Sequence, residues 1–302
     1  MAGVLLAILV ALAVFAPAFY QPQPLLSLLT REAPTLLVAC GMALAIIARQ
    51  IDISVGSQFS VCSILAGTLA AAGWPLILVL PVAVAAGGLL GAVNGLLVAY
   101  LQLPAIVVTL ATMVTLRQGL NLVQQGQWVT LPDAFQWFGL SQVGGQLAIV
   151  GAGAVFVAGL AWCTRHLAVG RYPYAIGTHA EAARLAGIRP QLTTAMVFIF
   201  LGALTGLAAV MNIVQSPQIQ PLAGSGLELK VIAAVVVGGV SIAGGRGSLW
   251  GVLAGLLLLA CISPALTHLR VEAYWEKAIQ GAVILLAVVA DGVRQRKRVA
   301  HA

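Results

Sequence analysis

Charged residues are the scarcest feature of this 302-residue sequence, since Asp, Glu, Lys and Arg together make up only 8% of it. A soluble domain carries about 25% charged and about 45–50% apolar residues, whereas 61% of these residues are hydrophobic. A soluble chain of this size could not hide so much apolar surface from water. The composition therefore excludes an ordinary soluble enzyme and a disordered chain, and it indicates an integral membrane protein.

Chemically reactive groupings are missing as well. The four cysteines lie in apolar stretches without C-x-x-C spacing, which predicts packing roles and no disulfide or metal site. The sequence has no G-x-x-x-x-G-K-[ST] phosphate loop, no H-E-x-x-H spacing, and no basic stripe interleaved with aromatic residues. We therefore expect no ATP hydrolysis by this chain, no catalytic centre, no metal or other cofactor, and no nucleic-acid partner.

Apolar runs suited to a bilayer recur along the whole chain. A membrane-spanning helix needs roughly 20 residues, and ten runs approach or reach that length. We predict an all-α, polytopic helical bundle that forms a single transmembrane domain over residues 1–302. The predicted spans are 4–20, 35–48, 52–72, 75–100, 104–124, 147–163, 193–215, 230–243, 248–264 and 275–291.

Basic residues gather in an internal loop, 164–192, and in the C-terminal tail, 292–302. They are Arg165, Arg171, Arg184 and Arg189 in the loop, and Arg294, Arg296, Lys297 and Arg298 in the tail. Loops rich in Lys and Arg stay on the cytoplasmic side of a membrane. Counting alternating spans back from these two segments places the N-terminus inside too, so both termini are predicted to be cytoplasmic.

Two predicted spans, 35–48 and 230–243, are too short to cross a bilayer. Each offers about 14 residues, or about 21 Å of helix, and each ends in a polar bend that contains glycine, at 49–57 and 244–248. Aligning the bends places the first four spans opposite the last four in one orientation, which indicates a parallel internal repeat with interrupted helices. Such breaks point to a transport site; two unrelated glycine turns are the alternative.

Arg49 and Asp52 are three residues apart in the first of these bends, so they could pair across one helical turn. Charge this close to a membrane span is costly and suggests function. Asp52 could instead cap the helix that restarts at Ile53, with Ser54 beside it. The two roles are compatible, and direct contact between Asp52 and a substrate stays open.

Small residues dominate the loop from 177 to 190. Glu181 to Leu185 favours a helix, Gly187 ends it, and Pro190 prevents its continuation. A short alanine-rich helix on the cytoplasmic side is suited to insertion into a groove on a partner, with Glu181 and Arg184 setting its orientation. A plain connecting loop fits the composition equally well.

Polar residues inside the spans are the other candidates for function. They could line a translocation path, or they could hydrogen-bond helix to helix. Glu228 and Lys230 are expected at an outer mouth, as rim or docking residues or as a solvated turn. The candidate path residues are Asp52, Ser54, Ser57, Asn94, Thr109, Thr112 and Asn121, with Arg117 and Gln118 nearby.

Several strings resemble a known family. Glu181-Ala182-Ala183 followed by Gly187 resembles the EAA coupling loop of ATP-binding-cassette (ABC) importer permeases. Other segments look like signatures of the ribose and autoinducer-2 type, and these are 51–57, 182–188, 224–229, 232–239 and 244–248. Residues 126–129 and 131–132 look most like autoinducer-2 permeases, and rhamnose permeases are close to these. The chain departs from the family at Arg49-Gln50, where many members have two glycines, and at His179, where asparagine is common.

The resemblance implies a transport subunit and not an enzyme: a permease that moves a small sugar or sugar-like solute, such as autoinducer-2, rhamnose or ribose, by alternating access. It implies two cytosolic ATPase subunits, a second permease subunit, identical or different, and a periplasmic substrate-binding protein, in a bacterial inner membrane. ATPase coupling would fall on Gly177, Glu181, Ala182, Ala183, Arg184 and Gly187. The alternatives are a branched-chain amino acid ABC permease, an ion-coupled transporter that relies on Asp52, and a polytopic membrane enzyme.

Overall fold

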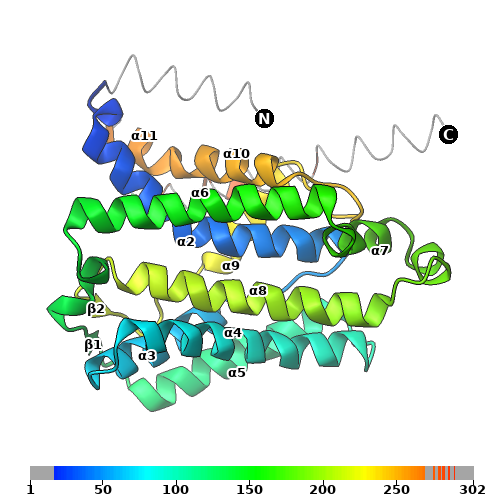
Figure 1. Cartoon of the computed structure of the whole chain (residues 1–302), viewed down its shortest axis with the longest axis horizontal. Coiled ribbons are helices and arrows are strands. Elements are labelled where there is room, and N and C mark those ends of the chain that lie inside the picture. Colours follow the sequence, from blue (N-terminus) through cyan, green and yellow to red (C-terminus); the bar gives the residue numbers. More distant parts are fainter. Residues whose placement is uncertain are drawn as a thin grey trace.

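Long helices lying side by side make up almost all of the computed structural model, which describes residues 17–268 and the isolated positions 275, 278, 279, 281, 282, 285 and 289 (Figure 1). In chain order the elements are η1 (Pro17–Tyr20), α2 (Pro22–Ile47), α3 (Val55–Ala71), α4 (Leu76–Ala99), α5 (Ala105–Gln124), β1 (Val129–Thr130), η2 (Asp133–Gly139), α6 (Gln142–His166), α7 (Ala168–Leu185), α8 (Pro190–Ile213), β2 (Gln218–Ile219), α9 (Leu227–Val237), α10 (Leu249–Ala260) and α11 (Ile262–His268). Most of the first and last predicted spans, and the tail 292–302, lie outside the described residues.

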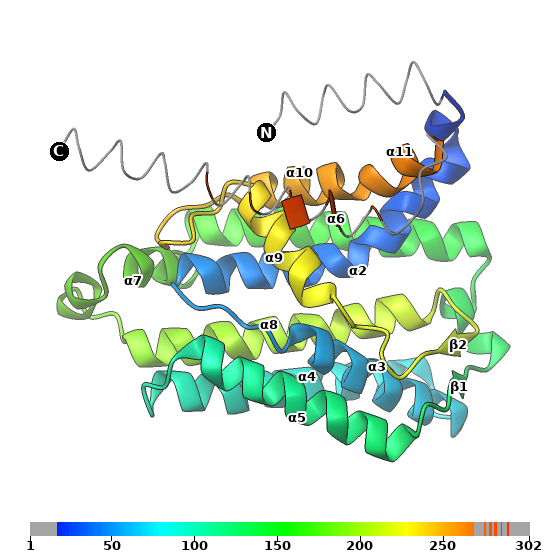
Figure 2. The ribbon, with the colours of Figure 1, turned by 180° about the vertical axis from the view of Figure 1, so that it is seen from behind.

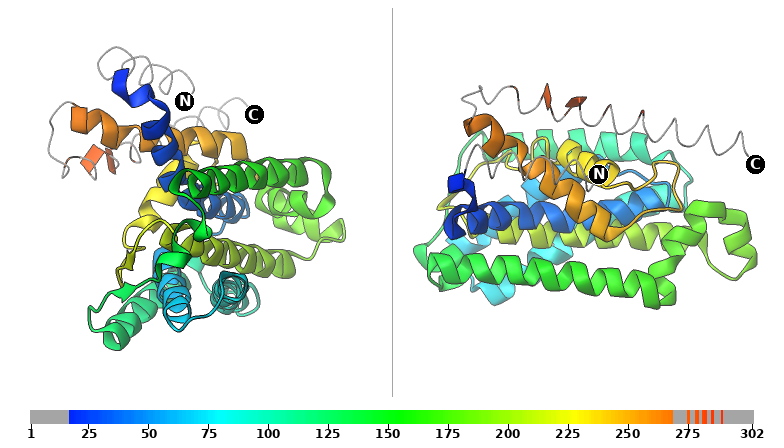
Figure 3. Two further views of the ribbon diagram at one scale, coloured as in Figure 1. Left: turned by 60° about the vertical axis from the view of Figure 1, so that its left-hand side comes forward. Right: turned by 90° about the horizontal axis from the view of Figure 1, so that it is seen from above.

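Six helical stretches in the described part are long and apolar enough to cross a membrane: α2, α4, α5, α6, α8 and residues 249–266 of α10–α11. The prediction of an all-α membrane protein is confirmed for this part of the chain. The β-structure described is a two-residue antiparallel ladder, in which Val129 pairs with Ile219 and Thr130 with Gln218. The ladder lies at one end of the bundle, and α7 projects from the opposite end (Figures 1 and 3). These are called the β end and the α7 end below.

The prediction of a short span at 35–48 is wrong, because α2 begins at Pro22 and runs for 26 residues. The uninterrupted apolar run begins after Pro34, but the helix continues back through Glu32. That carboxylate is buried and ion-paired with Lys230 of α9, which makes a charge tolerable inside a membrane helix. The other short span is confirmed in kind, since α9 has only 11 residues.

Both predicted helix breaks are present. The chain is not helical between the end of α2 at Ile47 and the start of α3 at Val55, nor between the end of α9 at Val237 and the start of α10 at Leu249. α2 and α9 run towards the α7 end before their breaks, and α3 and α10 run back from it (Figures 1 and 2). The two helix–break–helix units therefore share one orientation, as the proposed repeat requires.

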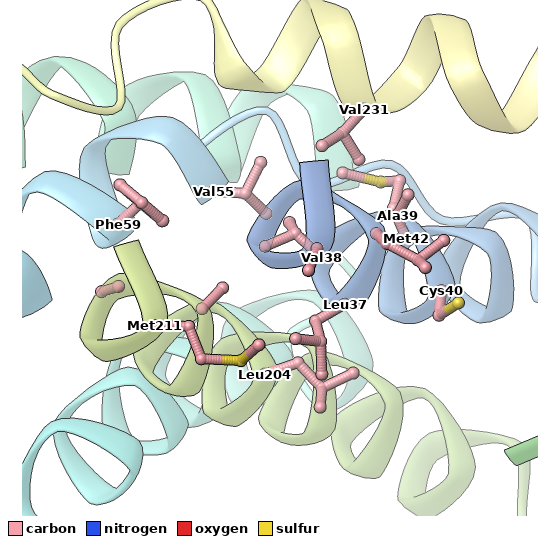
Figure 4. Close-up of a cluster of buried hydrophobic side chains, with 14 of the residues drawn as sticks. Leu37, Val38, Ala39, Cys40, Met42, Val55, Phe59, Leu204, Met211 and Val231 are labelled. Carbon is pink, nitrogen blue, oxygen red and sulfur yellow. The ribbon is translucent and has the colours of Figure 1, made fainter. Parts of the chain in front are cut away.

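The core is built around α2, which is buried along most of its length. Leu37, Val38 and Met42 of α2 belong to one buried apolar cluster with side chains from α3, α8 and α9. Figure 4 shows part of this cluster, including Phe59 of α3 and Met211 of α8. Helices of both interrupted units thus share a single core.

Helices α4 and α8 pack backbone to backbone. A β-carbon placed on Gly87 or Gly91 of α4 would overlap a carbonyl oxygen of α8, and one on Gly202 or Gly206 of α8 would overlap a carbonyl oxygen of α4. Glycines four residues apart allow this close approach between membrane helices. We call this contact the glycine seam.

The glycine seam gives a direct stability prediction. Gly91→Ala should lower the free energy of unfolding by about 1–3 kcal/mol, because the methyl group overlaps the Phe198 carbonyl and overpacking costs that much. Gly88→Ala is the matched control on the same helix, since its added carbon meets only ordinary contacts at 3.8 Å and beyond. Thermal unfolding of the detergent-solubilised protein measures both variants. Equal unfolding temperatures for the two variants would contradict the seam.

Candidate coupling and translocation sites

The segment predicted as a cytoplasmic loop is helical almost throughout. α7 spans 18 residues and changes direction at His179, whose backbone has φ −156° and ψ 99°. His179 Nδ1 accepts a hydrogen bond from the Ala182 backbone N–H at 3.1 Å, so it caps a short terminal helix as an asparagine would. We call residues 180–185, which follow this bend, the α7 tip; they contain the helix predicted at Glu181 to Leu185.

The α7 tip ends where the sequence predicted. Gly187 has φ +87°, a conformation that glycine adopts without strain. Its N–H donates to the Arg184 carbonyl at 3.0 Å, and the N–H of Ile188 donates to the Ala183 carbonyl at 3.0 Å. This pair of bonds is the Schellman motif, a common way to end a helix. The stop signal in the sequence is confirmed.

The candidate coupling residues divide between two faces of the α7 tip. Ala182 is exposed, and so are Glu181 and Arg184, whose side chains are 57% and 61% exposed and form a salt bridge of 2.5 Å. Ala183 is buried in a small cluster with Ile176 and with Ala48 at the end of α2. Hydrogen bonding to Arg184 lowers the pKa of the Glu181 carboxyl, so the pair is charged at neutral pH and is lost only as the pH falls through that lowered pKa.

Gly177 joins α7 to both helix breaks. A β-carbon on Gly177 would overlap the Ile47 carbonyl oxygen at the end of α2, and it would lie 2.6 Å from the backbone nitrogen of Gly245. The Gly245 N–H donates to that same Ile47 carbonyl at 2.8 Å. Three backbones therefore meet with no side chain between them: α7, the α2–α3 break and the α9–α10 break. We call this contact the three-way junction.

Arg49 belongs to the three-way junction. The pair with Asp52 that its spacing suggested does not form. It has φ +62°, and the N–H of Gln50 donates to the Ala45 carbonyl at 2.8 Å, which ends α2 much as Gly187 ends α7. Arg49 thus takes a left-handed conformation, which glycine adopts without strain. Its Nη2 donates to the Thr178 carbonyl in α7 at 3.2 Å. Arg49 and Asp52 do not pair across a helical turn, because α2 ends before Arg49.

Most of the candidate path residues meet in one buried polar cluster at the α2–α3 break. Asp52 is 0% exposed; its Oδ1 accepts from the N–H of Ser54 at 2.8 Å and from Ser54 Oγ at 2.5 Å. Its Oδ2 accepts from Gln58 Nε2 at 3.2 Å and from Asn94 Nδ2 at 3.4 Å. Thr112 Oγ1 donates to Asn94 Oδ1 at 2.7 Å. The cluster therefore links α3 to α4 and α5.

The remaining candidates are placed differently. Thr109 Oγ1 accepts from the Ile53 N–H at 3.1 Å and so ties α5 to the break, while Ser57 Oγ donates to the Met113 carbonyl at 2.9 Å. Asn121 is half-buried and lies apart from the cluster, and its Nδ2 donates to Gln118 Oε1 at 3.3 Å. Gln58 was missed by sequence reasoning, although its position four residues after Ser54, on the same helix face, was a usable signal.

A pocket of about 430 Å³ lies beside the polar cluster at the α7 end. It is lined by Arg49, Gln50 and Ile51 of the break and by the facing ends of α4 and α5, including Gln102 and Ala105. Its volume falls within the usual range of small-molecule sites. The break therefore supplies residues both to a buried polar cluster and to an accessible cavity of a size that suits a small solute.

Two ion pairs cross between helices towards the β end. Lys230 Nζ of α9 lies 2.9 Å from Glu32 Oε1 of α2, and Arg117 Nη2 of α5 lies 3.3 Å from Glu228 Oε1 of α9. Glu228 is only 7% exposed, so its prediction as part of a solvated turn is wrong. Glu32 was missed, although a lone carboxylate beside an apolar run was a signal.

The motifs that carry the family resemblance touch one another. Glu228 packs so closely on Gly56 that a β-carbon there would overlap Oε2, and a β-carbon on Gly224 would overlap the Gly56 carbonyl. Gly177 and Gly245 meet in the three-way junction. Membrane helices broken at matching places, a buried polar cluster beside one break, and an exposed α7 tip joined to both breaks define a helical membrane permease.

Comparison with known sequences places this permease in a family. The chain belongs to the family described as the permease component of branched-chain amino acid transport systems, whose profile matches residues 25–288. It is similar to the ribose import permease protein RbsC of Escherichia coli K12, with 34% identity over 301 residues that cover 96% of this chain and 93% of the relative. It is also similar to the autoinducer 2 import system permease protein LsrC of Escherichia coli O9:H4, with 36% identity over 258 residues that cover 85% of this chain and 75% of the relative. No solved structure matches significantly.

These relatives make the chain a permease subunit of an ABC importer, as the sequence motifs predicted. Permeases of this class are multi-pass proteins of the bacterial inner membrane. They work together with an ATPase and a substrate-binding protein. The chain is thus a transport subunit.

Proposed function

We propose that this permease moves a small sugar or sugar-like solute into the cytoplasm, as the names of its ribose and autoinducer-2 relatives suggest. The pocket of about 430 Å³ beside the α2–α3 break has the size for such a solute, and its lining residue Ile51 directly precedes Asp52 of the buried polar cluster. A transport pathway must release what it binds, so selection falls mainly to the binding protein. The family description favours one alternative, a branched-chain amino acid.

The three-way junction is the observation that carries the proposed mechanism. The α7 tip, with Glu181, Ala182 and Arg184 exposed, docks onto an ATPase subunit. Its movement reaches Gly177, and from there both helix breaks, because Gly177 contacts Ile47 and Gly245 directly. The α7 tip has to bind the ATPase with different affinity in the two conformations of the permease, because only a difference in affinity shifts the equilibrium between them.

The proposed topology has ten spans, with the α7 end and both chain termini in the cytoplasm. The arginine-rich segment that contains α7 is expected on the cytoplasmic side. Counting alternating spans from it towards each terminus places both termini on that side as well. The full importer then holds two ATPase subunits, two permease subunits, identical or different, and one periplasmic binding protein docked at the β end.

We place the pathway along α5. This helix is only lightly buried, and it exposes Val107, Leu110, Val114 and Leu122. Polar contacts attach it to α3 and α9, through Thr109, Ser57 and the Arg117–Glu228 ion pair. Such a helix can move against the bundle without disturbing a tightly packed core, and its apolar face suits the second permease subunit.

A competition experiment tests the solute and the energy source together. In proteoliposomes that hold the complete importer, we expect unlabelled ribose or autoinducer-2 to compete with labelled substrate, and leucine at the same concentration to leave uptake unchanged. Uptake should require ATP and persist when the proton gradient is collapsed. Competition by leucine would favour the amino acid alternative, and uptake driven by the gradient without ATP would contradict an ABC mechanism.

A further inference from the structure

A groove of about 540 Å³ opens between α6 and α8 at the α7 end of the bundle. Its lining is mainly apolar and includes Cys163 of α6, Val169 of α7, and Met196 and Phe200 of α8, with Leu44 of α2 also reaching it. α6 and α8 are both membrane-capable helices. The groove therefore opens on the side of the bundle, where membrane lipid is the surrounding solvent.

One end of the groove is lined by an arginine that has no carboxylate partner in the described part of the chain, and two more arginines lie next to lining residues in the sequence. Arg189, the residue that precedes α8, lines it. Arg171 Nη2 donates to the Arg165 carbonyl at 2.6 Å, which holds these two arginines together beside lining residues Thr164 and Gly170. Within residues 17–268, none of the three forms a salt bridge, and the acidic residue of this region, Glu181, is paired with Arg184.

The position of Trp162 marks how deep the groove lies in the membrane. This residue is exposed on α6, one residue before Cys163, and it stacks on His166 with ring centroids 5.4 Å apart. Tryptophan is enriched at the boundary between acyl chains and headgroups. The arginines then lie at headgroup level, and the apolar part of the groove, towards Phe200, lies at the level of the acyl chains.

We propose that this groove binds one anionic phospholipid of the inner leaflet, with an acyl chain along the apolar wall and the headgroup at Arg189. Basic pockets between membrane helices on the cytoplasmic side recognise anionic headgroups in this way. The positive end of the α8 dipole points to the same place. The lipid would contact α6, α7 and α8 at once, and it would steady the base of α7.

Native mass spectrometry of the purified full chain tests the proposal, with phosphatidylglycerol and phosphatidylcholine of identical acyl chains as probes. We expect phosphatidylglycerol to bind more tightly. Arg189→Gln should weaken its binding about fivefold, since one arginine near a lipid surface contributes about 1 kcal/mol, and should leave phosphatidylcholine unaffected. Thr193→Trp, which fills the groove, should weaken both lipids. Arg31→Gln is the control outside the groove: this exposed arginine of α2 lies 3.6 Å from Glu32, and its loss should leave the preference for phosphatidylglycerol over phosphatidylcholine unchanged.

Three results would overturn the proposal. One is equal binding of the two lipids, and another is an effect of Arg31→Gln as large as that of Arg189→Gln. The third is protection of a cysteine introduced at Thr193 by the ATPase subunit and not by phosphatidylglycerol, which would assign the groove to that protein instead.

Discussion

Gly177→Val is expected to abolish most solute uptake while ATP hydrolysis by the assembled importer continues. A side chain at this position overlaps the Ile47 carbonyl and the Gly245 amide, so α7 must move away from both helix breaks. Overpacking of this kind costs about 1–3 kcal/mol, and each 1.4 kcal/mol changes a population about tenfold. Uptake should therefore fall by about five- to a hundredfold. The measurement is uptake and hydrolysis in the same proteoliposomes.

The matched control is Gly159→Val on α6, where an added β-carbon meets nothing within 4 Å. It should leave uptake and hydrolysis as they are in the unaltered protein. Size-exclusion profiles of both variants show whether the bundle has formed. If Gly177→Val is folded and transports normally, the three-way junction does not carry the coupling.

Asp52→Ala is expected to cause the largest loss of stability of any single substitution in the polar cluster. It removes the acceptor of two donors on Ser54 and of the side-chain amides of Gln58 and Asn94. The two Ser54 donors lose their acceptor, whereas the amides of Gln58 and Asn94 keep Ser54 Oγ as an acceptor. Each buried donor left without a partner costs about 1–3 kcal/mol, so the total should reach several kcal/mol. The unfolding temperature in detergent measures this loss.

Two further variants define the effect of Asp52. Asn121→Ala removes a half-buried amide of α5 that lies outside the cluster and bonds to Gln118, and it should leave the unfolding temperature nearly unchanged. Asn94→Ala combined with Asp52→Ala should cost less than the sum of the single changes, because residues of one hydrogen-bond network are not additive. A normal unfolding temperature for Asp52→Ala would show that the cluster does not hold α3, α4 and α5 together.

Signals contained within a few residues predicted the structure well. Gly187 ends the α7 tip where the sequence indicated, and Gly244 and Gly245 take positive φ in the α9–α10 break. In the α2–α3 break the residue with positive φ is Arg49, and Gly56 of the predicted bend lies inside α3. The reason is that a positive φ or an extended stretch depends on the residues at that place. The cap that His179 forms on the α7 tip is also local, but it was not predicted because histidine is not among the usual capping residues.

Features that depend on distant partners could not be predicted in this way. The helix α2 was predicted too short because a charged residue such as Glu32 normally marks the end of a membrane span. Its partner Lys230, which neutralises it, lies 198 residues later in the sequence. Arg49 was assigned to Asp52 because both are close in sequence, whereas its partner Thr178 lies 129 residues away. The spacing of four between the glycines of the seam could be recognised in the sequence. Which two helices these glycines bring together could not.

The glycine seam also restricts how the bundle can deform. Where two backbones touch with no side chains between them, neither helix can slide or roll without driving a carbonyl oxygen into the facing chain. α4 and α8 therefore travel as one rigid body. Any rearrangement that opens a passage has to pivot elsewhere, and the non-helical stretches 48–54 and 238–248 provide the hinges.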